Sequence, residues 1–305
     1  MNTITRIKKS LIYRWPRIKY RLFYWPLGSV FYHFWNRPHV YSLEETLEKM
    51  VNDKLSICRF GNAEFDLIFG EDQEYQRYDN VLGDRLKDIL NTNKSNIIVG
   101  IPDVFDDLDK FEPFTKRWWK EYMITYSYKY RNLFKKSHYY NAFISRTATD
   151  YLEDQTGKII PGFKKMWDNR DLLIVEGKNT RIGIGNDLLS NTKSIKRILV
   201  PNRSAFSFYE DIMSAIRANL TGNELIILAA GPTATLLAYD LAQLGYQALD
   251  LGHFDIQYEH HIRGYKGKHA IPGKHFNEVA QTDNSIDKET ERLYRTQIVY
   301  TCVGE

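Results

Sequence analysis

The most constraining feature of this sequence is a regular alternation between short apolar runs and stretches with helical periodicity. Each apolar run ends at a glycine or a turn, and a helical pattern follows it. Strands that alternate with helices are typical of βαβ units, so we predict an α/β fold with a mostly parallel sheet and helices on both of its faces. The predicted strands are Leu55–Phe60, Ile97–Ile101, Asn141–Ser145, Leu172–Val175, Ile195–Val200, Leu225–Ala229, Ala248–Leu251 and Thr296–Cys302; the predicted helices span 42–52, 82–92, 111–134, 160–168, 185–191, 205–219, 232–244 and 253–263; an irregular polar flap is predicted at 264–295.

The charge of the chain is distributed unevenly. Residues 1–40 contain eight of the 42 Lys and Arg side chains and none of the 38 acids. Aromatic side chains are interleaved with these cations, which is typical of a segment that lies on an anionic membrane surface. We therefore predict an N-terminal extension at 1–40 that binds such a membrane, followed by one domain at 41–305. The alternatives are that the extension packs on the acidic body or that it stacks on single-stranded nucleic acid; nothing further along the chain supports nucleic acid, and we predict no such partner.

The remaining composition indicates a cytoplasmic protein. Two cysteines, Cys58 and Cys302, provide neither a disulfide framework nor metal-ligand spacing, which favours a reducing compartment. The sequence contains no run of about 18 apolar residues and no evident signal peptide. We predict a cytoplasmic location, peripheral at the inner face of the membrane.

Glycines and polar side chains gather where the predicted strands end, which is where ligands bind in open parallel sheets. Arg59, Gly61, Asn62 and Glu64 follow the first strand. An arginine there can bind phosphate oxygens with two N–H groups, and a glutamate can bind a divalent cation or a sugar hydroxyl. The alternative is a salt bridge that closes the turn.

The turn at Gly231–Thr235 has the features of an anion site. Gly231 permits a sharp turn, Pro232 suits the first position of a helix, and Gly245 is placed to end that helix. The free N–H groups and the positive end of the helix dipole would face the crevice, beside the hydroxyls of Thr233 and Thr235. This arrangement suits a diphosphate; the alternative is an ordinary turn with a threonine cap.

Two further motifs are less specific. Gly183-Ile-Gly185 resembles part of a dinucleotide fingerprint without its third glycine, and Asn186-Asp187 favours a helix cap. His253, Asp255 and Glu259 fall on one helical face, where paired carboxylates suit a general base or contacts to sugar hydroxyls. A solvated helix face is the alternative.

Taken in order, these motifs resemble those of the GT-D-fold glycosyltransferases, which include glucosyltransferases that build glycans on serine-rich-repeat adhesins. The resemblance covers about residues 42–280, and its specific segments are Val175–Leu188 and Gly231–Glu259. It implies a Rossmann-like sheet, a UDP-sugar donor that is typically UDP-glucose, and an Asp-x-Glu motif linked to a divalent cation, Mn²⁺ or Mg²⁺. The motifs are Arg59-Phe-Gly-x-x-Glu64, Ser145-Arg146, Val175-Glu-Gly-x-x-Thr-Arg-x-Gly-x-Gly-Asn-Asp-Leu188, Ala205-Phe-x-x-Tyr209, Gly231-Pro-Thr-Ala-Thr-x-x-Ala-Tyr-Asp-Leu241 and Asp250-x-Gly-His-x-Asp-x-x-Tyr-Glu259.

The resemblance also implies roles for individual residues. Asn62 stands where the family has aspartate, so we expect weaker metal binding that relies on Glu64 and the diphosphate. The implied donor and metal site contains Arg59, Gly61, Asn62 and Glu64; the same crevice would be lined by Thr180, Arg181, Asn186 and Asp187; the diphosphate would lie near Gly231, Pro232, Thr233 and Thr235; and His253, Asp255 and Glu259 would face the sugar or acceptor.

We therefore predict an enzyme that moves a hexose, expected to be glucose, from a UDP-sugar to a glycan or glycoprotein acceptor in surface polysaccharide or glycoprotein synthesis. In an inverting reaction, Asp255 is the first candidate for the general base and Glu259 the second. The alternative is a non-catalytic, membrane-associated partner in a glycan-assembly complex, with Asn62 marking a lost metal site. The sequence leaves open the donor sugar, the acceptor, the stereochemical outcome and the oligomeric state.

Overall fold

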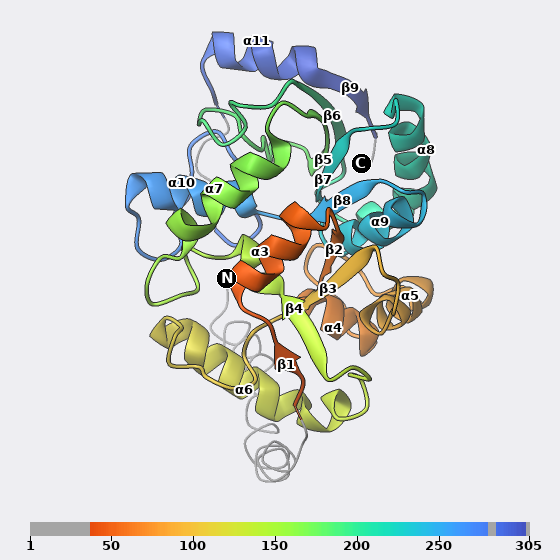
Figure 1. Cartoon of the computed structure of the whole chain (residues 1–305), viewed down its shortest axis with the longest axis vertical. Coiled ribbons are helices and arrows are strands. Elements are labelled where there is room, and N and C mark those ends of the chain that lie inside the picture. The colour runs from red at the N-terminus through yellow and green to blue at the C-terminus, as the bar shows by residue number, and fades with distance from the viewer. Residues whose placement is uncertain (1–36, 280–284, 303–305) are drawn as a thin grey trace, which may run out of the picture.

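A nine-stranded sheet organises the part of the chain that the computed structural model describes, residues 37–279 and 285–302 (Figure 1). Every ladder between neighbouring strands is parallel. The predicted extension at 1–40 lies outside the described residues up to residue 36. The strand order is β1-β4-β3-β2-β8-β7-β5-β6-β9, with β1 His39–Val40, β2 Ser56–Arg59, β3 Ile97–Ile101, β4 His138–Asn141, β5 Asp171–Gly177, β6 Ser194–Val200, β7 Leu225–Ala229, β8 Gln247–Asp250 and β9 Ile298–Thr301.

Helices cover both faces of this sheet, as predicted. Ile57 of β2 pairs in register with Leu249 of β8, so both side chains share a face with Gln247, whose amide donates to the Met50 carbonyl of α3 at 2.7 Å. Cys58 points to the other face, where its thiol lies 3.4 Å from the Thr235 carbonyl of α9. The helices are α3 Leu43–Asn52, α4 Asn62–Ile68, α5 Asn80–Leu90, α6 Pro113–Tyr130, α7 Thr156–Trp167, α8 Tyr209–Asn219, α9 Pro232–Gln243, α10 Phe254–Arg263 and α11 Lys288–Gln297.

The central strands are apolar because they are covered on both sides. All five residues of β3 and all five of β7 are buried, as expected for a parallel sheet between two helical layers. The capping box that the sequence predicts at Ser42 is present: the Ser42 hydroxyl accepts from the Glu45 N–H at 3.1 Å, and the Glu45 carboxylate accepts from the Ser42 N–H at 2.8 Å. These local signals predicted the elements well.

Three predictions of secondary structure are wrong. The strand predicted at Asn141–Ser145 ends at Asn141, and a 3₁₀ helix, η2, follows at Ala142–Ser145. The helix predicted at 185–191 is a series of turns, and the glycines at its start, Gly183 and Gly185, have positive φ angles of 72° and 77°. The polar segment 264–295, predicted to be irregular, contains the start of α11, which Asp287 caps through bonds to two backbone N–H groups.

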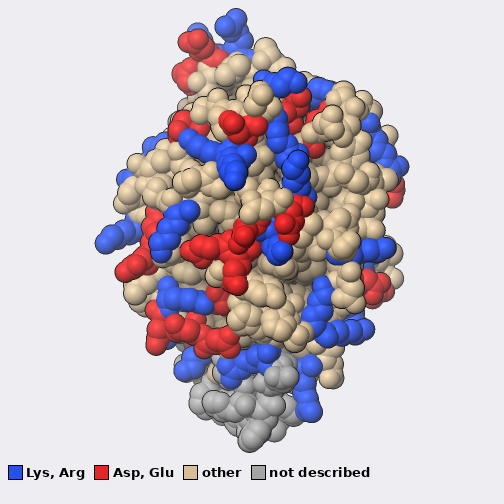
Figure 2. All heavy atoms as spheres, viewed as in Figure 1, with Lys and Arg blue, Asp and Glu red and all other residues tan. Residues whose placement is uncertain are grey.

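The face of the molecule in Figure 2 carries both signs of charge, with Lys and Arg interspersed among Asp and Glu rather than gathered into one basic stripe. None of the helices in the described parts of the chain is long and apolar enough to cross a membrane.

Candidate functional site

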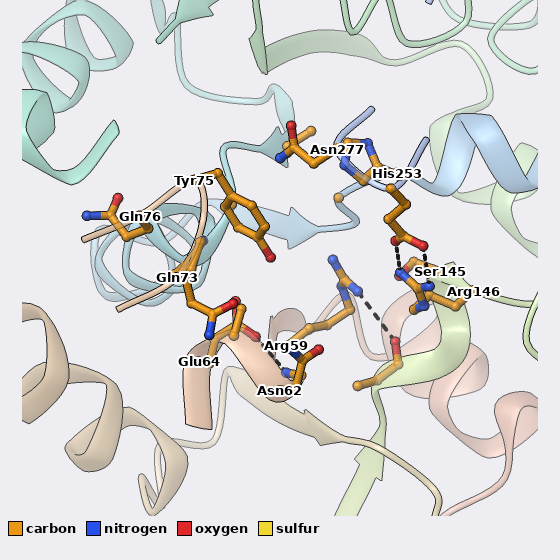
Figure 3. Close-up of a pocket in the computed structure, with 18 of the residues that line it drawn as sticks. Arg59, Asn62, Glu64, Gln73, Tyr75, Gln76, Ser145, Arg146, His253 and Asn277 are labelled. Atoms are coloured by element: carbon orange, nitrogen blue, oxygen red, sulfur yellow. Dashed lines mark hydrogen bonds and ion pairs between the residues drawn. The ribbon is translucent and has the colours of Figure 1, made fainter. Parts of the chain in front are cut away.

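A cavity of about 680 Å³ lies where β2, β7 and β8 end (Figure 3). Its lining includes Arg59, which ends β2, Ala230, which directly follows β7, and Asp250, which ends β8; Gly231 and His253 follow shortly after. This is the carboxyl edge of the sheet, the place where open parallel sheets bind ligands. Further walls come from η2, from α6, from the segment at 73–76 and from the segment that follows α10.

Arg59 stands in the middle of the cavity, as Figure 3 shows. Its guanidinium donates to the Asp250 carbonyl and, at 3.0 Å, to the Asp250 carboxylate, and its third nitrogen faces the Ala142 carbonyl at 3.5 Å. Gly252 permits this approach, since a Cβ there would lie 2.6 Å from an Arg59 nitrogen. The arginine is therefore held in one orientation before any ligand arrives.

Glu64 and Asn62 lie beside Arg59 at the start of α4 (Figure 3). The Glu64 carboxylate accepts from the Gly61 N–H at 2.6 Å. Burial of this carboxyl, together with the nearby charge of Asp250, raises the pKa of Glu64 to about 7. A carboxyl group with a pKa near neutrality can exchange a proton at physiological pH, which suits acid–base chemistry.

The start of α9 has the predicted form. Gly231 adopts φ 57° and ψ −148°, and Pro232 occupies the first helical turn. Both residues line the cavity, and the ring of Tyr75 lies 3.7 Å from the position that a Gly231 Cβ would take. Thr233 and Thr235 are buried behind this turn; the Thr235 hydroxyl donates to the Arg59 carbonyl at 3.0 Å. Neither threonine lines the cavity, which meets the helix end at Gly231 and Pro232 instead.

A second charged wall faces Arg59 across the cavity. The guanidinium of Arg146 donates to both oxygens of Glu278, at 2.5 and 3.0 Å, and to Asp150 at 2.6 Å. Burial alone would raise the pKa of Glu278, but the positive charges of Arg146 and Lys268 hold this pKa well below its usual range. The sequence motifs included Ser145-Arg146, but they did not reveal its partner Glu278, because 132 positions separate Arg146 from Glu278 and no local pattern connects them.

Two polar atoms of the cavity have no hydrogen-bond partner among the described residues, Nδ1 of His253 and Oγ of Ser145. Burial lowers the pKa of His253 to about 4, so its imidazole is neutral at neutral pH. Buried polar atoms are usually hydrogen-bonded, and a site where they are not has capacity for a polar ligand. His253 therefore lies where its motif predicted.

The structure does not bring Asp255 and Glu259 to the cavity. Their carboxylates are 2% and 1% exposed and bind the ammonium of Lys274 at 2.5 and 3.1 Å. The amide of Asn186 donates to both, at 2.9 and 2.7 Å. This group, which we name the Lys274 network, consists of Asp255, Glu259, Lys274 and Asn186, and it ties α10 to the 183–186 loop and to the segment after α10.

Thr180 lines the cavity, but Arg181 and Asp187 from the same motif do not. Arg181 is buried, where it donates to the Gly273 carbonyl at 2.7 Å and pairs with Glu291 at 3.2 Å. Asp187 lies on the outside, paired with Lys164 at 2.6 Å. The turns at 178–193 explain the difference, because successive side chains of a turn point in different directions.

The described residues contain no group of three or more His, Cys, Asp or Glu side chains that could hold a metal ion. In the cavity, Asp250 is bound to Arg59, and Arg146 binds the two carboxylates opposite. Glu64 and Asn62 therefore offer one carboxylate and one amide oxygen. That set fits a cation that takes most of its ligands from a diphosphate and water, as Mg²⁺ commonly does.

Comparison with known proteins gives a consistent result. The family model described as glycosyltransferase GT-D fold matches residues 57–279. Glycosyltransferase GlyD of Streptococcus pneumoniae serotype 4 (strain ATCC BAA-334 / TIGR4) is 37% identical over 85% of this chain and 32% of its own length. The probable glycosyl transferase Gly of Streptococcus gordonii is 37% identical over 87% of this chain and 39% of its own length. The chain thus spans less than half the length of these curated relatives.

Solved structures agree. One, described as the highly conserved domain of unknown function 1792 with a distinct glycosyltransferase fold, superimposes with a TM-score of 0.83 at 33% identity over 90% of this chain and 99% of its own. Another, described as a new glycosyltransferase from Streptococcus sanguinis, gives a TM-score of 0.82 at 34% identity over 88% of this chain and 100% of its own.

Proposed function

We propose a reaction from the premise that this chain belongs to the glycosyltransferase GT-D fold family. The reaction transfers a hexose, expected to be glucose, from a UDP-sugar to a glycan or glycoprotein acceptor during surface polysaccharide or glycoprotein synthesis. The observation that carries the proposal is the meeting of Arg59 with the start of α9 inside one cavity. A preoriented cation and the positive end of a helix dipole suit a diphosphate.

These two groups stabilise the departing UDP. Charge builds on its phosphate oxygens as the bond to the sugar breaks, and donors that are already oriented stabilise that charge without reorganising. Asp250 and Gly252 hold Arg59 in place, while Gly231 and Pro232 expose the helix end. Nδ1 of His253 is left to bind a hydroxyl of the sugar.

Glu64 takes the role of general base in this proposal. We assign it there rather than Asp255, because Asp255 is bound in the Lys274 network and Glu64 lines the cavity with a pKa near neutrality. In an inverting reaction, Glu64 accepts the proton of the acceptor hydroxyl. The acceptor oxygen forms a bond to the anomeric carbon, and UDP leaves with the electron pair of the broken bond.

A divalent cation remains a prediction. It would supply positive charge to the diphosphate, with Glu64 and Asn62 as its protein ligands. Attachment of residues 1–40 to an anionic membrane also remains a prediction; deletion of residues 1–36 should release the protein from anionic vesicles in a sedimentation assay.

Release of UDP from UDP-glucose, with and without Mn²⁺ and then with chelator, tests the proposed donor. Even without an acceptor, slow transfer to water should release UDP, and the Arg59→Ala variant should release less. If a folded sample neither binds UDP-glucose nor releases UDP in any condition, the proposal fails and the non-catalytic alternative gains support.

A further inference from the structure

Helix α6 lines the mouth of the cavity with aromatic side chains. Phe114, Trp118 and Trp119 all belong to the lining. Phe114 and Trp118 are four positions apart, so their side chains lie one above the other on the same side of the helix. Phe114 is 64% exposed. An exposed aromatic ring forgoes the large stabilisation that its burial would provide. We name the surface formed by Phe114 and Trp118 the α6 aromatic face.

Contacts on the inner side hold this face in place. The Trp118 ring stacks on Tyr122 with centroids 4.9 Å apart and an angle of 12° between the planes. The Tyr122 hydroxyl donates to Asp66 at 2.6 Å and faces the Asn62 carbonyl at 3.3 Å. The aromatic face is therefore connected directly to the start of α4, the helix that carries Glu64.

The other side of α6 is joined to the Arg146 wall. The hydroxyl of Thr115 donates to Asp150 at 3.2 Å, and Asp150 accepts from Arg146 at 2.6 Å. The Trp119 ring packs edge-on against Phe143 of η2, with centroids 6.0 Å apart. Helix α6 thus spans the cavity from the Glu64 side to the Arg146 side, and its exposed ring stands at the opening.

We propose that the α6 aromatic face binds the acceptor, and that the acceptor presents a pyranose ring to it. This inference rests on the proposed function and adds the acceptor class and the residues that select it. A pyranose ring has an apolar C–H face that packs on an aromatic plane, and rigid aromatic residues bind at low entropic cost. Polar side chains for its hydroxyls are present in the same cavity, among them Gln73 and Asn277 (Figure 3).

Position favours the acceptor over the nucleobase of the donor. The diphosphate site lies at the ends of β2, β7 and β8, and the cavity extends from there in two directions. One direction leads toward β5 and β6, where Gly177, Thr180 and Asn202 line the cavity with backbone and polar groups and no aromatic ring. The other leads past Glu64 to the α6 aromatic face, so a ring stacked there lies on the side of the cavity that holds the proposed base.

The test uses the full chain with Phe114→Ala and Trp118→Ala, and Tyr128→Ala as a matched control. Tyr128 is an exposed aromatic residue of the same helix that does not line the cavity. The probes are gentiobiose, lactose and N,N′-diacetylchitobiose, each titrated in the presence of saturating UDP and followed by saturation-transfer NMR. The Kd of UDP is measured on the same samples.

We expect at least one disaccharide to bind the unmodified chain, and each aromatic variant to weaken that binding about tenfold, the scale of a lost aromatic contact. The UDP affinity and the Tyr128→Ala variant should stay unchanged. The inference is overturned if no disaccharide binds, if the aromatic variants leave disaccharide binding unchanged, or if they weaken UDP instead, which would make this face the nucleobase site. If the unmodified chain does not bind UDP, the result counts against the proposed function. If it binds UDP but the aromatic variants leave disaccharide binding unchanged, the result counts against this inference alone.

Discussion

Two charged regions lie side by side at the carboxyl edge of the sheet, and they differ in how completely their charges are satisfied. In the Lys274 network, one ammonium joins the carboxylates of Asp255 and Glu259, and the Asn186 amide binds both. In the cavity, Nδ1 of His253 has no partner among the described residues, and the pKa of Glu64 is raised to about 7.

This difference separates structural from functional charge. A buried charge that is fully paired holds elements together and is costly to break. A buried carboxyl whose environment opposes ionisation has a proton available for exchange, and such groups cluster at active sites. Both regions follow strand ends in the sequence, so position along the chain did not distinguish them. They differ in whether their buried polar groups have partners within the protein.

Replacing Glu64 by glutamine should have the largest effect, and it tests whether the cavity is the functional one of the two regions. The amide retains the shape of the side chain but cannot accept a proton, so kcat should fall about 100- to 10,000-fold, the range for loss of a general base. The UDP affinity measured with chelator, where Glu64 has no cation to bind, should change little. Steady-state kinetics and donor titration measure both quantities, and a variant with unaltered kcat would remove Glu64 from the role of base.

The matched change in the other region is Asp255→Asn. It leaves Lys274 without its closest charge partner in a buried site, so the free energy of unfolding should fall by about 3 kcal/mol in urea denaturation. Turnover per folded molecule should remain within a few fold of the unmodified chain.

Asp171→Asn is the control for that experiment, because Asp171 forms an exposed pair with Lys193 and its loss should cost no more than about 1 kcal/mol. If Asp255→Asn were as stable as the unmodified chain yet inactive, the original assignment of Asp255 as the base would return.

A smaller effect is expected from Gly252→Ala. The residue has φ 49°, and the added Cβ would lie 2.6 Å from the Arg59 guanidinium, displacing it from Asp250. The Kd for the donor should rise about tenfold, the scale of one charge-assisted hydrogen bond. Gly264→Ala is the matched control, with φ 62° and no atom near the added Cβ. Equal donor affinity in the two variants would show that Arg59 does not bind the donor.

The smallest effect concerns pH and sharpens the assignment of Glu64. A base must be deprotonated, so kcat/KM should rise with pH through about 7; a bound cation would hold the pKa lower and move the rise to more acidic pH. The pKa of Glu64 in the folded protein also lies above its ordinary value of 4.5, so the stability contributed by this group is lost as pH rises from about 4.5 to about 7. Glu64→Gln should therefore raise Tm relative to the unmodified chain more at pH 8 than at pH 5; an equal difference at both pH values would contradict the raised pKa.

Local chemistry explains which features the sequence predicted. Gly231 and Pro232 require a particular backbone at the start of α9, and the apolar runs of β3 and β7 fit only a sheet covered on both faces. These features depend on neighbours in the chain. The residues Arg59, Glu64 and His253 were found for the same reason, since a residue at a strand end lies at the carboxyl edge whatever surrounds it.

What the sequence did not reveal depends on distant contacts. The orientation of the Asp255 side chain is fixed by its bonds to Lys274 and Asn186, which reach α10 from two different segments. The Arg146–Glu278 pair joins segments 132 positions apart. In the same way, aromatic residues occur along the whole of α6, so the sequence of this helix does not show that Phe114 and Trp118 are the ones that line the cavity.

The central claim, that this cavity binds a nucleotide-sugar donor, is tested most directly by calorimetric titration of UDP-glucose into the full chain and into Arg59→Ala, with Mn²⁺ and then with chelator. We predict binding by the unmodified chain that Arg59→Ala weakens at least tenfold, and stronger binding with Mn²⁺ would add the cation to the site. No binding by a sample shown to be folded, or binding that Arg59→Ala leaves unchanged, would contradict the account.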